Sequence, residues 1–226
     1  MSPITVDLKE SRPAFLLYFN NIYAGSMGSD STYTASMPEA MFILQESRQI
    51  ASLMLEYQDR DYIKELVHQD NLLNVKSKSN EDKIFGFTYN RLDLISDRLK
   101  LILINGSDMD SRFVNLISIM AYDKLFCEFV FEVYYDHLLS KDTLTDYDIM
   151  SFYQRKGRED ETVGSWKDST LNKLRCRYAR ILFSAGLVDK SVGIREIRTP
   201  FVSQDTLDVL QSEGFGNYVK ATLGIL

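Results

Sequence analysis

The sequence predicts a mainly α-helical protein, a multi-helix bundle with a C-terminal winged-helix-like segment that carries a short β-hairpin. Three observations lead to this fold class. Apolar residues recur at helical spacing along most of the 226 residues. Only 4 prolines and 11 glycines interrupt them, which leaves little room for a loop-rich β fold. Near the C-terminus, a basic amphipathic helix precedes a short stretch of apolar residues set among basic ones, which suggests a hairpin.

Four helices are predicted in the first hundred residues. Ser36 and Glu39 have the spacing of a capping box, and Pro38 is tolerated in a first helical turn. Ser79 with Asp82 marks a later start of the same kind. The first predicted helix starts at Ser36 within the segment 30–57, and the others cover 61–73, 79–92 and its continuation 93–104, which ends at "NGSD".

The best candidate for the central core is the apolar and aromatic region 110–140, which contains "FCEFVFEVYY". Its helical pattern predicts either one long helix or two helices that meet near Tyr122 and Asp123. A polar connection follows Ser140, and it suggests a domain boundary. Residues 1–140 would then form an N-terminal helical domain with a helix-turn-helix-like element, and 141–226 a C-terminal winged-helix-like domain. One compact unit is the alternative.

The last part of the chain has its own start and stop signals. Thr145 with Asp148 marks a helix start, 156–165 reads as a polar loop, and a helix through "STLNKLRCRYARILFSAGLV" ends at Gly186, which suits a left-handed cap. The remaining elements are a hairpin around Ile194, Ile197 and Phe201 and a last helix from Ser203 to about Glu213.

Charge is distributed unevenly along the chain. The formal net charge is −6 and the pI is near 5.1, so nucleic-acid binding must rest on local charge. Residues 167–198 carry a net charge of +5 and residues 128–148 a net charge of −5. A basic side and an acidic side are therefore expected.

No enzymatic motif is present, so we expect a protein without catalytic, cofactor or metal sites. The glycines of "AGSMGSDST" lack the spacing of a phosphate-binding loop. His68 and His137 are too far from Cys127 and Cys176 in sequence to give a short zinc-ligand pair, and both thiols are expected to be buried and free. No run of about 20 apolar residues and no signal peptide is seen, so a soluble cytoplasmic protein without membrane insertion is expected.

The basic helix near the C-terminus is the first candidate site. At about 100° per residue its apolar side chains share one face, and three cations lie opposite. The apolar face consists of Leu171, Leu174, Tyr178, Ile181, Leu182 and Ala185, and the predicted nucleic-acid contacts are Lys173, Arg177 and Arg180 with Lys190, Arg195 and Arg198 from the following hairpin. This layout is that of a winged helix, in which the helix enters the major groove. A merely solvated basic face is the alternative.

A second candidate lies in "NVKSKSNEDKIFGF". Lys76 and Lys78 fall in a turn between two helices and Lys83 on the second helix, as in a helix-turn-helix. An ordinary polar loop is the alternative.

Three segments, "STYTASMPEAMFILQESRQIASLML", "DNLLNVKSKSNEDKI" and "SWKDSTLNKLRCRYARILFSAGLVD", resemble the BrxA family of the BREX bacteriophage-exclusion systems. The resemblance runs from about Tyr33 to Asp189. It implies a mostly helical, NusB-like fold, no enzymatic activity, and a nucleic-acid-binding role in a multi-gene phage-defence system. The hairpin beyond Val192 is inferred from the residues alone.

Three functions follow as hypotheses. The first is binding of double-stranded DNA. The second is an adaptor that docks other BREX proteins, such as the methyltransferase or an ATPase, through aromatic-rich helices. The third is RNA binding of the NusB type, which ranks below duplex DNA because the aromatic residues of "FCEFVFEVYY" follow a buried pattern.

Overall fold

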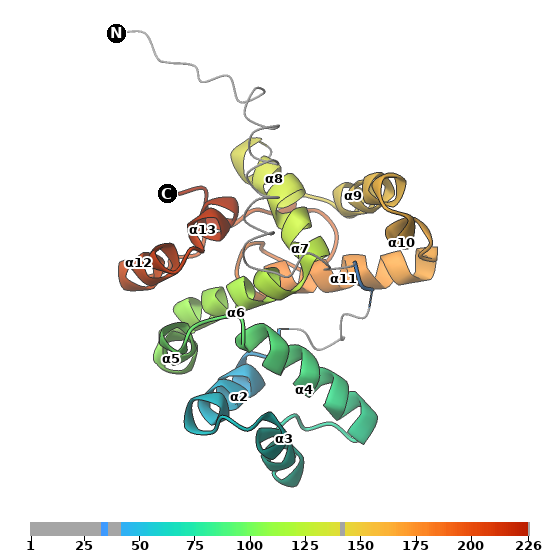
Figure 1. The fold of residues 1–226 in the computed structure, drawn as a ribbon. Helices are drawn as coiled ribbons and strands as arrows, with labels where there is room; N and C mark the ends of the chain where they lie inside the picture. The colour runs from blue at the N-terminus through green and yellow to red at the C-terminus, as the bar shows by residue number, and fades with distance from the viewer. Residues whose placement is uncertain (1–32, 36–41, 141–142, 226) are drawn as a thin grey trace, which may run out of the picture. The chain divides into compact units, whose positions relative to one another are not determined.

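The computed structural model describes residues 33–35, 42–140 and 143–225. Residues Thr34–Leu226 form one compact unit, and the description below concerns this unit. It is mainly helical, as predicted (Figure 1). The predicted capping box of Ser36 and Glu39 lies outside the described residues.

The first group of helices comprises α2 (Leu44–Glu56), α3 (Arg60–Gln69), α4 (Lys78–Leu92) and α5 (Asp97–Asn105). Two predicted helix starts in this group were wrong. The helix α5 begins after Ser96, whose hydroxyl accepts the backbone N–H of Leu99. The helix α4 begins after Ser77, two residues before the predicted Ser79.

The helix α3 also ends earlier than predicted, at Gln69. Asn71 and Asn74 adopt left-handed backbone conformations with φ of 46° and 48°, which a continuing helix does not allow. The side chain of Asp82, predicted to cap α4, instead lies 2.7 Å from Lys64 Nζ and 3.2 Å from His68 Nε2. This contact fastens α4 to α3.

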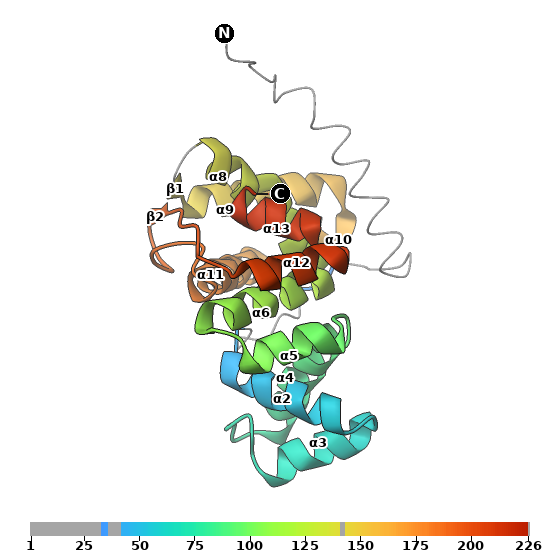
Figure 2. The same cartoon turned by 90° about the vertical axis from the view of Figure 1, so that its left-hand side faces the viewer.

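The centre is formed by α6 (Asp108–Tyr122), α7 (Lys124–Phe129), the π-helix η1 (Val130–Tyr134) and α8 (Tyr135–Ser140). Asp123 separates α6 from α7 and accepts the backbone N–H of Phe126 at 2.8 Å, which confirms the predicted meeting point of two helices. In Figures 1 and 2, α6 lies between the α2–α5 group and the C-terminal elements. Its residues are therefore buried along almost its whole length.

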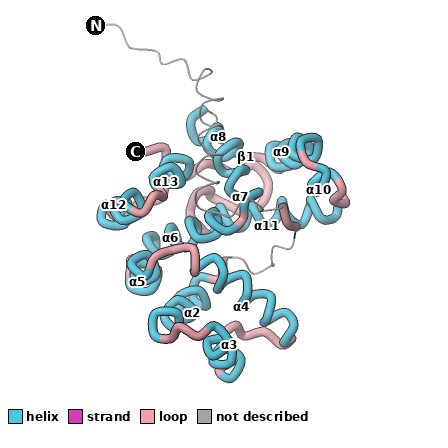
Figure 3. Tube along the Cα trace, viewed as in Figure 1, coloured by secondary structure: helices cyan, strands magenta, loops and turns pink. Residues whose placement is uncertain are grey.

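The C-terminal elements begin with β1 (Thr143–Leu144), α9 (Asp146–Glu159), α10 (Glu161–Gly164), α11 (Asp168–Ser184) and β2 (Arg195–Glu196). The capping box of Thr145 and Asp148 is confirmed. The predicted loop 156–165 is wrong, because its first residues complete α9 and Asp160 caps α10 through the N–H of Val163. Figure 3 shows α9, α10 and α11 as helices in cyan, with the loop segments between them in pink.

A small antiparallel sheet joins the two ends of this part. Strand β1 pairs with β2, and an isolated bridge joins Val188 to Ile197, which confirms a short hairpin. The hairpin is closed by the bonds from Asp189 N to the Glu196 oxygen at 3.1 Å and from Arg198 N to the Leu187 oxygen at 2.9 Å. The pairing with β1 was not foreseen.

Two helices end the chain, α12 (Gln204–Ser212) and α13 (Gly216–Leu223). Ser203 caps α12 as predicted, whereas α13 was missed. Packing crosses the proposed boundary at Ser140, since α12 packs on α5 and α13 packs on η1 and α8. The Ser203 N–H also donates to Asp110 of α6 at 2.8 Å, which fixes the start of α12 to the centre.

Candidate nucleic-acid interface

The apolar face of α11 is buried, as the sequence predicts. Tyr178 is the anchor, with its ring centroid 4.9 Å from that of Phe126 and 5.2 Å from that of Phe129. Leu174 and Leu182 are buried on the same face. This packing fixes which side of α11 faces outwards.

The outward side of α11 carries the three cations predicted from its periodicity. Lys173 and Arg180 are exposed, and Arg177 is half-buried. None of the described carboxylates forms an ion pair with any of the three. By contrast, Arg175, at the edge of the apolar face, pairs with Asp146 at the start of α9. The outward face therefore keeps three positive charges that the described part of the chain does not neutralise.

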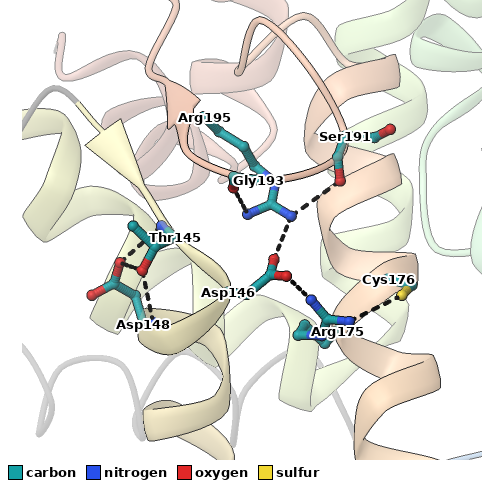
Figure 4. A network of polar contacts seen from close by, with 8 residues as sticks. All are labelled: Thr145, Asp146, Asp148, Arg175, Cys176, Ser191, Gly193 and Arg195. Carbon is teal, nitrogen blue, oxygen red and sulfur yellow. Dashed lines mark hydrogen bonds and ion pairs between the residues drawn. The ribbon is translucent and has the colours of Figure 1, made fainter.

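The prediction that Arg195 lies on the surface was wrong. Its side chain is buried, and its guanidinium donates to Asp146 Oδ1 at 2.6 Å and to the carbonyl oxygens of Gly193 at 2.9 Å and Ser191 at 3.0 Å (Figure 4). Burial lowers the pKa of Arg195, and the charges of Cys176 and Asp189 oppose that shift. We therefore remove Arg195 from the candidate nucleic-acid contacts and assign it a structural role.

The other two cations of the hairpin are exposed, but each has a carboxylate beside it. Arg198 Nη2 lies 2.7 Å from Glu196 Oε2, and Lys190 Nζ lies 3.7 Å from Asp189 Oδ2. Surface pairs of this kind contribute little stability, yet they reduce the local positive charge. The hairpin is therefore a weaker electrostatic site than the sequence suggests.

Asp146 is the residue of this region that sequence reasoning missed. Its two carboxylate oxygens form ion pairs with the guanidinium groups of Arg175 and Arg195. The side chain of Asp146 therefore connects α9, α11 and the hairpin (Figure 4). Nothing in the local sequence marks this role, because Asp146 also has the ordinary appearance of an acidic residue in a first helical turn.

Cys176 differs from the expectation of a buried thiol. It lies on the exposed side of α11, where Arg175 Nη2 approaches its Sγ at 3.6 Å, and only Cys127 is buried. Neither cysteine forms a disulfide.

The second candidate site is separate from the first. Lys76, Lys78 and Lys83 are all exposed, in the turn before α4 and in its first part. In Figures 1 and 2 the α3–α4 pair lies at the bottom of the view and α11 above its middle. The two groups of cations therefore lie on different elements, one on α4 with the turn before it and the other on α11.

The predicted acidic segment is largely engaged in internal contacts. Lys156 Nζ lies 2.7 Å from both Glu128 and Glu132, and Asp146 is shared by two arginines. Asp148 caps α9. These carboxylates are therefore not free charges on an acidic surface.

The two histidines have partners, as predicted. His68 Nδ1 lies 2.5 Å from Glu81, and His137 Nδ1 lies 2.5 Å from the Thr143 carbonyl oxygen. Within the described ranges, no three His, Cys, Asp or Glu side chains are grouped so that they could hold a metal ion. None of the described helices is both long and apolar enough to cross a bilayer.

Comparison with known proteins adds three findings. The family model of BrxA matches residues 31–214. A protein of Bacillus cereus (strain H3081.97), "BREX protein BrxA", is 30% identical over 88% of this chain and 100% of its own length, and one of Escherichia coli O9:H4 (strain HS) with the same name is 22% identical over 82% and 87%. The crystal structure of an uncharacterized protein from Magnetospirillum magneticum matches 85% of this chain and 98% of its own, with a TM-score of 0.74 and 22% identity.

Proposed function

The chain belongs to the BrxA family of the BREX phage-defence systems, and from this membership we propose that it binds double-stranded DNA through the exposed side of α11, without enzymatic activity. The observation that carries the proposal is the group Lys173, Arg177 and Arg180, for which the described residues provide no carboxylate partner. Phosphates of a duplex would supply the missing negative charge. A cytoplasmic location, with access to DNA, is part of the proposal.

The order of elements supports the same function. Helix α8 is followed by β1, then α9 and α11, then the hairpin that pairs Val188 with Ile197 and β2 with β1. This order resembles that of a winged helix, in which the helix corresponding to α11 enters the major groove. The buried Tyr178 and Leu174 hold α11 by its inner side, so that its outer side is available for a ligand.

RNA is a weaker candidate. Single-stranded RNA is usually bound by stacking bases on exposed aromatic rings. Phe126, Phe129 and Tyr134 of the aromatic-rich segment are buried, so they offer no such platform.

The experiment is a fluorescence-anisotropy titration of a labelled duplex with the wild type and with Arg177→Glu/Arg180→Glu. The variant should bind about a hundredfold more weakly at moderate salt, because two attractions become two repulsions. The slope of log Kd against log salt should also decrease by about 2, since each phosphate contact contributes about 0.9. Unlabelled single-stranded RNA of equal length, added as a competitor, should displace the duplex poorly.

Lys76→Glu/Lys83→Glu is the matched control, because it changes the net charge by the same amount at the second candidate site. It should bind the duplex nearly as the wild type does. If instead the control loses binding and the α11 variant retains it, the site is α3–α4. If the α11 variant folds and binds as the wild type does, α11 carries only a solvated basic face.

An adaptor role is a second candidate, favoured by the side chains of Phe201 and Phe183, which are 87% and 47% exposed. Exposed aromatic residues are enriched at protein interfaces. Phe201→Ser should then reduce co-purification with other BREX proteins after nuclease treatment while leaving duplex binding unchanged. If this variant retains every partner, Phe201 is not part of a docking surface.

A further inference from the structure

We propose that the protein binds a single chloride ion in its core, against the guanidinium of Arg91, where α2, α4 and α6 meet. These three helices pack on one another in pairs. Arg91 belongs to α4, and its side chain is completely buried. The proposal goes beyond duplex binding, because it concerns the core and does not depend on the exposed side of α11.

The guanidinium of Arg91 is held by neutral oxygen atoms. Its Nη1 donates to Asn115 Oδ1 at 2.7 Å and to Ser118 Oγ at 2.5 Å. Its Nη2 donates to Ser47 Oγ at 2.6 Å. The two serine hydroxyls donate their own protons to the carbonyl oxygens of Ile43 and Asn115, so toward the guanidinium they act only as acceptors. No carboxylate of the described residues pairs with Arg91.

The positive charge of Arg91 is the property that these neutral groups do not compensate. Burial lowers the pKa of Arg91 to about 9, so the guanidinium remains protonated at neutral pH. A buried cation is unfavourable unless an anion accompanies it, even where it is hydrogen-bonded. Arg195, a second buried arginine, has its anion in Asp146 at 2.6 Å. A monovalent anion from solution would give Arg91 the same compensation.

Three buried polar atoms around Arg91 have no hydrogen-bond partner among the described residues. They are Arg91 Nε, Asn115 Nδ2 and Thr88 Oγ1. The Nδ2 atom belongs to the amide whose oxygen already contacts the guanidinium, and Thr88 lies three residues before Arg91 on α4. Each of the three can donate a hydrogen bond. A group of free donors beside a positive charge suits an anion.

The enclosure of this group selects chloride among anions. Arg91, Thr88 and Asn115 are all 0% exposed, so no face of the site is open to solvent. A phosphate, a sulfate or a carboxylate ligand has several atoms and would force the closely packed helices apart. Chloride is monatomic, carries one negative charge and accepts hydrogen bonds from any direction. A buried water molecule would also accept from these donors but would leave the charge of Arg91 uncompensated.

The direct test is a crystal structure of the wild type grown in bromide, which replaces chloride and scatters anomalously. The expected result is an anomalous peak within hydrogen-bond distance of Arg91 Nε. The proposal is overturned if water lies at that position, if no atom is found there, or if bromide occurs only as an adventitious ion elsewhere.

The same site is tested in solution by the melting temperature, with chloride replaced by gluconate at constant ionic strength. An ion that binds only the folded protein should raise the melting temperature by about 5 °C or more when its concentration reaches about a hundred times its Kd. Arg91→Met should lose this shift. Arg195→Met is the matched control and should keep the shift, because the anion beside Arg195 is the carboxylate of Asp146.

Equal chloride shifts in the wild type and in Arg91→Met would place the effect at another site and overturn the proposal, as would a wild type without any shift. If Arg91→Met does not fold, the bromide crystal of the wild type decides alone. No duplex is present in these measurements, so their outcome leaves the proposed function unchanged.

Discussion

Asp123 is a buried carboxylate in the centre of the molecule. It is buried between α6 and α7, where it caps α7. Burial raises the pKa of its carboxyl to about 6, against the opposing hydrogen bonds from the N–H groups of Phe126 and Leu125. The folded protein therefore binds a proton at Asp123 more readily than the unfolded chain does. This group's stabilising contribution is complete below about pH 4 and is lost as the pH rises to about 6.

Asp123→Asn should keep the cap and remove the buried charge. We expect it to increase the free energy of unfolding at pH 8 by about 1–3 kcal/mol, and by less at pH 5, where the wild-type carboxyl is itself largely protonated. Urea titrations at the two pH values measure the difference. Asp59→Asn, which alters an exposed cap of α3, should show the same small difference at both. If Asp123→Asn changed the free energy of unfolding equally at pH 5 and pH 8, the raised pKa of Asp123 would be contradicted.

Two arginines, Arg91 and Arg195, are buried, and the local sequence does not predict their burial. Arg91 is completely buried and binds Ser47, Asn115 and Ser118 instead of a carboxylate, and burial lowers its pKa to about 9. Arg195 is buried on Asp146, 49 residues away in sequence. Exposure is the usual state of arginine. The sequence therefore placed Arg177 and Arg180 well, by their spacing on a helix, but had no local signal for Arg91 or Arg195.

At the scale of elements, periodic segments were predictable and short ones were not. The 17-residue helix α11 has a clear apolar face, and the capping box of α9 begins at the expected residue. The helices α10 and α13 have 4 and 8 residues, too few for a helical period to be recognised. The hairpin was predicted, but the pairing of β1 with β2 was not. The two strands are some fifty residues apart, and no local pattern specifies such a partner.

The contact of α9 with the end of α7 and with η1 is predicted to depend on Lys156. The side chain of Lys156 is 8% exposed and lies between Glu128 and Glu132. Burial alone would lower its pKa, but the two carboxylates outweigh that effect and the pKa is raised. Removal of Lys156 would take away the cation that lies between the buried Glu128 and its neighbour Glu132.

Lys156→Ala should therefore lower the free energy of unfolding by about 3–5 kcal/mol. Arg155→Ala is the matched control, because Arg155 pairs with the same Glu132 but is 49% exposed, and it should cost less than about 1 kcal/mol. Urea unfolding at neutral pH measures the free energy of unfolding of both variants. Equal losses would show that the Lys156 network does not hold α9 on η1.

At the scale of the whole described unit, the α2–α5 group and the C-terminal elements share the buried helix α6. Packing of α12 on α5 and of α13 on η1 crosses position 140. The sequence suggested a boundary there because polar residues follow Ser140, with one compact unit as the alternative, and the contacts across position 140 favour that alternative. Local polarity marks a turn in the chain, whereas domain limits depend on long-range contacts that the sequence does not display.

The central claim, that duplex DNA lies on the exposed side of α11, can be tested on the unmodified protein. Cys176 lies on that side between Lys173 and Arg180, whereas Cys127 is buried and should react only after unfolding. The measurement is the rate of alkylation of Cys176, followed by mass spectrometry, with and without saturating duplex. Bound duplex should strongly slow alkylation at low salt, and high salt should restore the rate. Unchanged alkylation under conditions where the duplex is fully bound would place the DNA elsewhere and contradict the account.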